Sequence, residues 1–291
     1  MSRTDPDVAL RTRIYRPPSG PAASRATRWH AGGTLFCRPA EFPTMSDDPW
    51  HEDPTFWGTL EGLLFPPEKL DAAADELDAL LSLAGVDGGR VLDIPCGVGR
   101  HAVELAGRGF EVTGVDATGR YLETARRRAE AAGVDPEFVE ADMRAFARPE
   151  AFDLVLNVYT SFGYFEDRTD DRRTARSFHE SLADGGRLVM SLTSKEVVAE
   201  RFQERTWSEQ DGTYLLEEHD VRDDWSWMEN RWVVVEDGET REFEVSHRLY
   251  SAHELSTLLE SVGFDEVDVY GDWQGAPFDQ DAERLVVVAG K

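Results

Sequence analysis

Apolar and polar positions repeat with two different periods along this chain, and the first clear pattern is helical. Between residues 66 and 85 apolar side chains recur every three or four positions, and acidic side chains fill much of the opposite face. This spacing places the apolar side chains on one face of a helix, and Gly85 follows as a stop signal. The pattern predicts one amphipathic helix over residues 66–84.

Short apolar segments then alternate with amphipathic ones. We expect strands over residues 90–95, 110–115, 136–140, 152–158 and 186–192, and helices over 99–108, 118–132 and 169–183. Strands and helices that alternate with such short connections form a parallel sheet covered by helices on both faces. The pattern therefore predicts an α/β fold.

The pattern changes after about residue 200. The segments TYLLEEHDV, NRWVVVED and REFEVSHRLY look like antiparallel strands, and EDGE makes a turn between the last two. Helical spacing returns in SAHELSTLLESVGF, and the segments DEVDVYG and ERLVVVAGK close the chain as two more strands. We predict a core with N-terminal helices over 45–199, an antiparallel β lid over 200–250, and a helix and strands over 251–291 that complete the core.

Charge adds a prediction about the environment of the protein. The formal net charge is −26 at pH 7, which costs self-repulsion in dilute buffer and is tolerated where concentrated salt screens it. We therefore expect a protein of a halophilic cell, and we take that cell to be a haloarchaeon.

Residues 1–44 differ from the rest, because they contain seven arginines against three acids and lack apolar periodicity. This composition predicts a disordered basic extension. We favour a segment upstream of the true start, at Met45, over a nucleic-acid arm or a targeting peptide.

Cysteine content and hydropathy limit the class of protein further. Two cysteines cannot form a disulfide framework, and neither has the spacing of a zinc site, so we expect no metal. The chain has no run of about 18 apolar residues that would span a membrane. We predict a cytoplasmic protein that does not act at a membrane.

The stretch VLDIPCGVGRHA contains the first candidate site. Its residues 97–102 fit the pattern G-x-G-x-x-G/A at a turn from strand to helix, where glycines let a ligand approach and the helix presents its amides. Asp116 ends the next strand, 19 residues beyond Gly97, and can accept from both hydroxyls of a ribose. These features suit NAD and S-adenosylmethionine equally.

Three further features separate the two cofactors. Asp93 lies inside the first strand, and Pro95-Cys96 makes the turn unlike the usual dinucleotide entry. Asp142, in the segment EADMR, ends the third strand and can accept from the exocyclic amine of an adenine. A polar and aromatic loop, NVYTSFGYFED, follows the fourth strand. Together these features favour S-adenosylmethionine.

The segments VLDIPCGVGRHAVELAGRGFEVTGVD, EADMR, FDLVLNVYTSFGYF and LADGGRLVM resemble successive motifs of the class I S-adenosylmethionine-dependent methyltransferases. The resemblance is strongest to a small-molecule-type subgroup with an Asp-x-Pro-Cys-Gly turn. It implies a Rossmann-like fold, with a seven-stranded, mostly parallel sheet whose last strand is antiparallel, plus a small antiparallel β insertion. It also implies that the methionine part of S-adenosylmethionine lies over the glycine turn. The ribose then lies on the acid after the second strand, and the adenine lies against the loop after the third strand. The cofactor-binding residues that it implies are Asp93, Gly97, Gly99, Arg100, Asp116, Ala117, Asp142, Met143 and Asn157.

The motifs predict the methyl donor but leave the acceptor open. We expect methyl transfer to an N, O or C nucleophile of a small molecule, because the lid is separate and no recognition domain is appended. The candidate catalytic residues are Tyr159 and Tyr164, from the loop after the fourth strand, and His247, near the end of the lid.

The sequence leaves two alternative functions open and suggests a second copy of the chain as a partner. A methyltransferase of protein or nucleic acid is one alternative, although an acidic body opposes phosphate binding. An NAD-dependent oxidoreductase is the other. Tryptophans at positions 207, 225, 227 and 232 make the lid a candidate homodimer contact.

Overall fold

The computed structural model describes residues 49–291, so the extension predicted over residues 1–44 lies outside the described part of the chain. Seven strands form one sheet: β1 (Arg90–Asp93), β2 (Glu111–Asp116), β3 (Glu137–Glu140), β4 (Phe152–Asn157), β5 (Leu182–Leu192), β10 (Glu266–Tyr270) and β11 (Leu285–Gly290). Their order is β10-β11-β5-β4-β1-β2-β3, and β11 runs antiparallel to both of its neighbours. The predicted seven-stranded sheet with an antiparallel last strand is confirmed.

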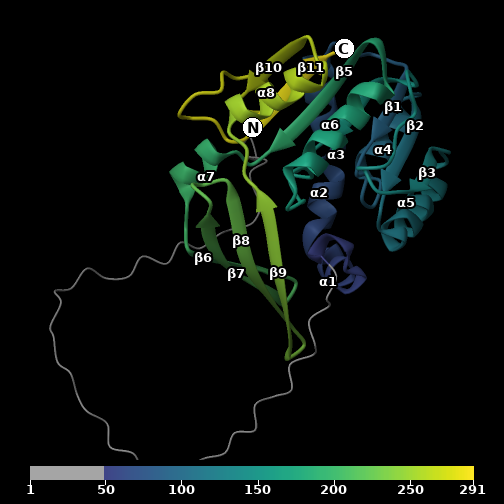
Figure 1. Cartoon of the computed structure of the whole chain (residues 1–291). Coiled ribbons are helices and arrows are strands. Elements are labelled where there is room, and N and C mark those ends of the chain that lie inside the picture. Colours follow the sequence, from purple (N-terminus) through teal and green to yellow (C-terminus); the bar gives the residue numbers. More distant parts are fainter. Residues whose placement is uncertain (1–48) are drawn as a thin grey trace, which may run out of the picture.

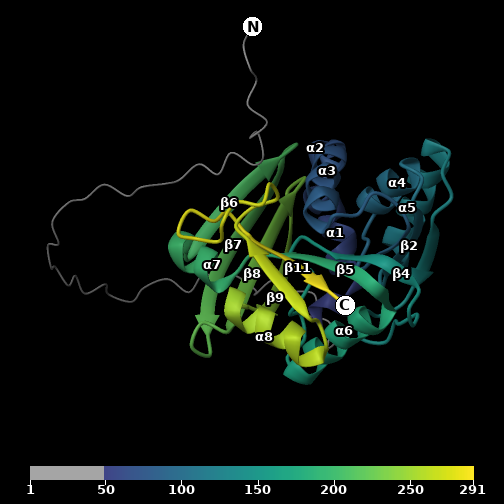
Figure 2. The same ribbon diagram turned by 90° about the horizontal axis from the view of Figure 1, so that it is seen from above.

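Helices cover both faces of this sheet (Figures 1 and 2). One face carries α3 (Ala73–Ala84), α4 (Arg100–Gly107) and α5 (Gly119–Ala132), and the other carries α6 (Arg168–Ser181) and α8 (Ala252–Val262). Both faces are therefore apolar, and all six residues of β11 are buried. Burial on both faces explains why the core strands read as nearly continuous apolar runs.

The N-terminal helical region differs from the single helix that the pattern predicts. The described part begins with a 3-10 turn, η1 (Trp50–Glu52), and α1 (Pro54–Leu64), and the predicted helix is split into α2 (Pro67–Asp71) and α3. At the break, the carbonyl of Lys69 accepts a hydrogen bond from Arg100 Nη1 at 3.1 Å. A tertiary contact to the glycine-turn helix therefore occupies a carbonyl that a continuous helix would pair internally.

A second sheet lies beside the core sheet and is called the lid sheet here. It is antiparallel and consists of β6 (Arg205–Gln210), β7 (Thr213–Arg222), β8 (Trp227–Glu236) and β9 (Glu239–Arg248), and the short helix α7 (Lys195–Arg201) leads into it. In Figure 1 this sheet stands apart from the core sheet, with α1 near its β9 edge. The antiparallel insertion is confirmed, with β6 as a strand that the pattern does not predict.

The outer face of the lid sheet carries apolar side chains in solvent. Trp207, Tyr214 and Leu216 are 43%, 44% and 43% exposed. The homodimer predicted through this insertion stays a prediction. Over residues 49–291, no helix combines the length and apolarity needed to cross a membrane.

Candidate active site

A cavity of about 460 Å³ lies between the carboxyl ends of the core strands and the inner face of the lid sheet. In the sheet, β1 lies between β4 and β2, so the strand order reverses between β1 and β4. Open α/β sheets bind ligands at this place. The sequence-predicted residues that line the cavity are Asp93, Gly97, Arg100, Asp116, Ala117, Asp142, Met143, Tyr159, Tyr164 and His247.

The glycine turn connects β1 to α4, and its two glycines have different surroundings. Gly97 lines the cavity with φ 54°, and a Cβ there would lie 2.8 Å from Phe65 Cζ. Gly99 precedes α4 with φ 73°, and a Cβ there would lie 2.8 Å from the Cβ of Ala125 on α5. Gly99 does not line the cavity, and its missing side chain lets α4 and α5 approach each other. Its role in cofactor binding stays a prediction.

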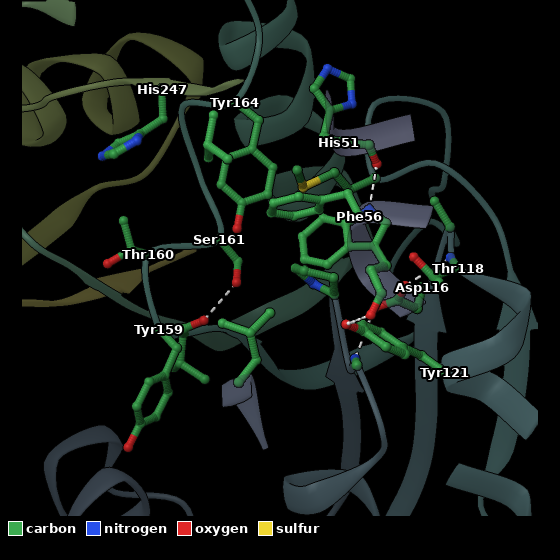
Figure 3. A pocket seen from close by; sticks show the side chains of 18 of the residues that line it. His51, Phe56, Asp116, Thr118, Tyr121, Tyr159, Thr160, Ser161, Tyr164 and His247 are labelled. Atoms are coloured by element: carbon green, nitrogen blue, oxygen red, sulfur yellow. Dashed lines mark hydrogen bonds between the residues drawn. The ribbon is translucent and has the colours of Figure 1, made fainter. Parts of the chain in front are cut away.

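Asp116, at the end of β2, is tied to the glycine turn. Its Oδ2 accepts from the amide of Gly97 at 2.8 Å, and its Oδ1 accepts from the amide of Thr118 at 2.8 Å. Burial raises the pKa of this carboxyl, and the two amides oppose that rise. Each oxygen keeps a lone pair, and Figure 3 shows Asp116 beside Thr118 and Tyr121 at one side of the cavity.

Asp93, at the end of β1, presents an unused oxygen. The residue is 2% exposed, and its Oδ2 has no hydrogen-bond partner among the described residues. Burial raises its pKa to about 7, and Asp116 adds to the rise while Arg100 opposes it. Nη2 of Arg100 is also buried without a partner in the described part. Buried polar atoms need partners, so this wall of the cavity is suited to a polar ligand.

Asp142 follows β3 and is fixed by the residue two positions later. The amide of Arg144 donates to its Oδ1 at 2.7 Å, and Arg144 Nε donates to its Oδ2 at 2.8 Å. Although burial raises the pKa of Asp142, the hydrogen bonds from Arg144 hold it below its usual range. The carboxylate is therefore ionised at neutral pH and can accept hydrogen bonds from a ligand.

Asn157, at the end of β4, does not line the cavity. It is fully buried, and its Nδ2 donates to the carbonyl of Ile94 at 2.8 Å and to that of Ser161 at 3.3 Å. Its role in cofactor binding stays a prediction. Asn157 joins the end of β1 to the loop that carries Tyr159 and Tyr164.

Tyr159 lies at the centre of a charged cluster beside the glycine turn. The centroid of its ring is 4.5 Å from Lys69 Nζ, 4.1 Å from Arg100 Cζ and 5.0 Å from Arg284 Cζ. Its hydroxyl donates to Glu76, and Arg100 Nη1 donates to the same carboxylate at 2.5 Å. Three cations surround one acid, so this corner of the cavity attracts an anion.

The charged cluster shifts the pKa values of its members. Although burial raises the pKa of Glu76, hydrogen bonds from His101 and Tyr159 and the charge of Arg100 lower it to about 2. Burial, followed by Arg100, lowers the pKa of Lys69 to about 8. Burial lowers the pKa of His101 to about 4 and raises that of Tyr159, so both side chains are neutral at pH 7. Only Arg100, His101 and Tyr159 of this cluster are indicated by sequence motifs.

Tyr164 occupies the middle of the cavity. In Figure 3 its ring lies between His247 and Asp116, and its hydroxyl points toward Ser161. Burial raises its pKa to about 12, so the phenol is protonated at neutral pH. Its ring centroid is 4.8 Å from that of Trp50, and Trp50 Nε1 donates to the carbonyl of Ser246 on β9 at 2.8 Å. The η1 turn therefore closes the cavity between the core and the lid sheet.

The lid sheet contributes His247 and several residues that sequence motifs do not indicate. His247 lines the cavity, and burial together with the neighbouring His219 lowers its pKa to about 4, which keeps the ring neutral. Glu217, His219 and Asn230 line the same cavity from β7 and β8. Their side chains point inward because alternate residues of a strand face opposite sides.

Known proteins resemble this chain in sequence and in structure. A family model described as a methyltransferase domain matches residues 91–186. The chain is 29% identical over 209 residues to YqeM of Bacillus subtilis, a protein named as a methyltransferase, and the match covers 70% of this chain and 84% of that protein. A solved S-adenosylmethionine-dependent methyltransferase from Clostridium acetobutylicum has a TM-score of 0.68 at 16% identity, covering 81% of this chain and 97% of that one.

A second solved structure was determined with S-adenosylmethionine bound. It is an amino pentose methyltransferase from Micromonospora echinaspora, with a TM-score of 0.55 at 25% identity, covering 76% of this chain and 91% of that one. These three proteins come from bacteria, so the expected haloarchaeal origin stays a prediction.

Topology and comparisons agree on the class of reaction. The reversed strand β11 lies between β5 and β10, which departs from the order 3-2-1-4-5-6 of dinucleotide-binding folds. The methyltransferase domain match runs from β1 into β5 and so includes the glycine turn, Asp116, Asp142 and the loop after β4. The chain is therefore an S-adenosylmethionine-dependent methyltransferase of the class I fold, with S-adenosylmethionine as its cofactor.

Proposed function

We propose that the protein methylates a small molecule enclosed between the core and the lid sheet. The observation that carries this proposal is the single cavity shared by the glycine turn and the inner face of the lid sheet. Trp50 joins its two walls through the hydrogen bond to Ser246, which suits an enclosed acceptor better than a polymer. The amino pentose methyltransferase that resembles this chain in structure supports a small acceptor.

The residues of the strand ends fit the parts of the cofactor. Asp116 keeps lone pairs for the two ribose hydroxyls, and Asp142 can accept from the adenine amine beside Ala117 and Met143. The unpartnered Oδ2 of Asp93 suits the ammonium of the methionine part.

The cation cluster suits the opposite charge. Lys69 and Arg100 line the cavity beside Gly97 and can hold the carboxylate of the methionine part. When bound, S-adenosylmethionine supplies an activated methyl group that a nucleophile takes by in-line displacement. The chain contributes by holding that nucleophile in line, and orientation of this kind can supply about 7–11 kcal/mol of the barrier.

The proposed catalytic residues act by position rather than as strong bases. Tyr159 and Tyr164 are protonated at neutral pH and His247 is neutral, so each can orient an acceptor through a hydrogen bond. Tyr164 and His247 face the acceptor side of the cavity, whereas Tyr159 lies in the charged cluster.

Calorimetric titration in molar salt tests the cofactor site. We expect tight binding of S-adenosylhomocysteine and no heat from NADH, and the reverse result contradicts the proposed site. Transfer of a labelled methyl group to the fractions of a cell extract tests the acceptor. Label in the small-molecule fraction supports the proposal, whereas label confined to protein or nucleic acid contradicts it.

A further inference from the structure

Four side chains on the inner face of the lid sheet form a hydrogen-bonded row, named here the lid row. Thr206 Oγ1 lies 3.0 Å from Glu217 Oε2 and 3.1 Å from His219 Nε2. His219 Nδ1 lies 2.7 Å from Asn230 Oδ1, and Asn230 Nδ2 donates to the carbonyl of Val245 at 2.9 Å. The four side chains come from β6, β7 and β8, the hydrogen bond to Val245 reaches β9, and three of the side chains line the cavity.

The directions of these hydrogen bonds fix one proton on His219. A carbonyl oxygen only accepts, so Asn230 gives its amide nitrogen to Val245 and its oxygen to His219. Nδ1 of His219 therefore carries a hydrogen. Nε2 can then accept from Thr206 in the neutral ring, or donate to Thr206 in the protonated ring while Thr206 donates to Glu217. The lid row can thus hold one additional proton with both ring nitrogens still hydrogen-bonded.

The charges around the lid row suit a cationic ligand. Among the described residues, Lys69 and Arg100 are the only lysine and arginine that line the cavity, and both pack on Tyr159 beside the glycine turn. The half of the cavity under the lid instead presents the carboxylate of Glu217. Its aromatic lining comprises Trp50, Phe56, Tyr164 and Trp232. A carboxylate and aromatic faces together stabilise an ammonium group.

We propose that the lid row binds an amine acceptor and takes up the proton that the amine loses before it accepts the methyl group. This inference rests on the proposed function. The ammonium pairs with Glu217 and passes one proton to its carboxylate. Glu217 passes a proton on to Thr206 Oγ1, while Thr206 passes its own hydrogen to His219 Nε2. One N–H bond of the ammonium breaks and one N–H bond of His219 forms, so the amine regains a free lone pair and the ring becomes an imidazolium.

Other titratable groups face the same half of the cavity. They are His247 from β9, His51 and Glu52 from η1, and Tyr164 from the loop after β4. The pKa of His247 is lowered to about 4, so this ring is a poor proton acceptor at neutral pH. The lid row is distinguished from these groups because its hydrogen bonds accommodate both protonation states.

Three ligands of similar size test the charge preference. The protein loaded with S-adenosylhomocysteine is titrated in a calorimeter with benzylamine, benzyl alcohol and benzoate in one buffer. We expect benzylamine to bind about tenfold more tightly than benzyl alcohol, because its charge strengthens the hydrogen bonds, and benzoate to bind most weakly. Benzoate binding as tightly as benzylamine, or no binding of benzylamine, overturns the amine assignment.

A matched pair of variants locates the preference on the strand. Glu217→Gln removes the carboxylate charge inside the cavity and should abolish the preference for benzylamine. Glu218→Gln is the control, because Glu218 pairs with Arg205 and Arg231 on the outer face of the same strand. Equal loss in both variants overturns the assignment. If the unmodified chain does not bind S-adenosylhomocysteine, that result contradicts the proposed function rather than the amine assignment.

The relay is tested by the hydroxyl at position 206. Formation of S-adenosylhomocysteine with benzylamine is followed against pH in Thr206→Val and Thr206→Ser. We expect Thr206→Val to lose about hundredfold in kcat below the pKa of benzylamine and to recover above it, where the amine arrives neutral, while Thr206→Ser keeps the normal profile. An equal loss at every pH, or binding of benzylamine without methyl transfer, overturns the relay. Glu217→Gln tests the same row if Thr206→Val does not fold.

Discussion

The half of the cavity proposed to hold the methyl donor (the donor half) and the half proposed to hold the acceptor (the acceptor half) are built in different ways. In the donor half, each acid stands at the end of a core strand, and backbone amides fix Asp116 and Asp142. In the acceptor half, the lid row draws its side chains from three strands and Trp50 closes it from a distant turn. A local motif can therefore report the methyl donor, whereas cross-strand register decides what surrounds the acceptor.

The two sheets also differ in how they are stabilised. The core sheet is covered by helices on both faces, whereas β7 has one buried residue, Leu215, among exposed and partly buried ones. The lid sheet therefore depends on its attachment to the core. Arg248 provides one such attachment, in addition to the hydrogen bond from Trp50 to Ser246. Its Nε donates to Asp171 Oδ2 at 3.0 Å, and its Nη2 donates to the carbonyl of Glu166 at 2.7 Å.

Removing the acid at this attachment should have the largest effect on stability. Asp171 is 0% exposed and the side chain of Arg248 is 7% exposed, so Asp171→Ala leaves a buried charge without its partner. We expect a loss of about 3–5 kcal/mol in the free energy of unfolding, measured by urea denaturation.

A surface pair serves as the control for that measurement. Arg90 and Asp153 are each 42% exposed, so Asp153→Ala should cost about 0–1 kcal/mol from the lost ion pair. Similar losses in the two variants would show that the contact between the lid and the core is not a principal support of the fold.

The second largest effect should be on the affinity for S-adenosylhomocysteine, which depends on the donor half alone. Asp116→Ala removes the acceptor of two backbone amides and of the proposed ribose hydroxyls, so S-adenosylhomocysteine should bind about 1–3 kcal/mol more weakly in calorimetry. Asp153 lies near the amino end of β4, away from the carboxyl ends of the strands that line the cavity, so Asp153→Ala should bind S-adenosylhomocysteine normally. Unchanged affinity in Asp116→Ala would show that the ribose lies elsewhere.

A smaller effect should appear as a pH dependence. Burial raises the pKa of Asp93 from 3.8 to about 7, so the folded protein holds this proton more tightly than the unfolded chain does. Its stabilising contribution is therefore complete below about pH 4 and is lost as the pH rises through about 7.

The variant Asp93→Asn stays neutral and separates this effect from the others. With both proteins free of cofactor, we expect the fall in Tm between about pH 5 and about pH 8 to be shallower in Asp93→Asn than in the unmodified chain. In the unmodified chain, S-adenosylhomocysteine should bind more tightly as Asp93 ionises, because the carboxylate attracts its ammonium. The same pH slope in both chains would rule out Asp93 as the source.

The smallest effect should be that of salt concentration on Tm. With a net charge of −26, raising potassium chloride from about 0.1 M to about 1 M shortens the Debye length from about 10 Å to about 3 Å and should raise Tm. Sorbitol at equal osmolality is the uncharged control. A Tm that falls with salt would contradict the halophilic prediction.

Much of the fold follows from local patterns, and the exceptions have identifiable causes. Short apolar runs predict the core strands, and helical spacing predicts the helices between them, to within a few residues. Strand β6 is not predicted because its one large apolar side chain, Trp207, faces solvent. The split before α3 is not predicted, and at this break the carbonyl of Lys69 accepts from Arg100, a contact between distant positions that local spacing does not report.

The candidate site shows the same division. The sequence predicts the positions of Asp93, Asp116 and Asp142 on the cavity wall, because the carboxyl ends of parallel strands meet at one edge of a sheet. It does not predict that the side chain of Asn157 donates to the carbonyl of Ile94 and lies outside the cavity lining. It does not indicate Glu76, which enters the site only because α3 packs against α4.

The sequence by itself determined the α/β order, the glycine turn and the class of methyl donor, since these depend on residues a few positions apart. Only the tertiary structure decided the charged cluster around Tyr159, the attachment of the lid through Arg248 and the lid row. These features join segments that are distant in the chain, such as those of Lys69 and Arg284, and their geometry depends on sheet register and helix packing. Periodicity records which face of an element is buried, but it carries no information about which distant side chain that face will meet.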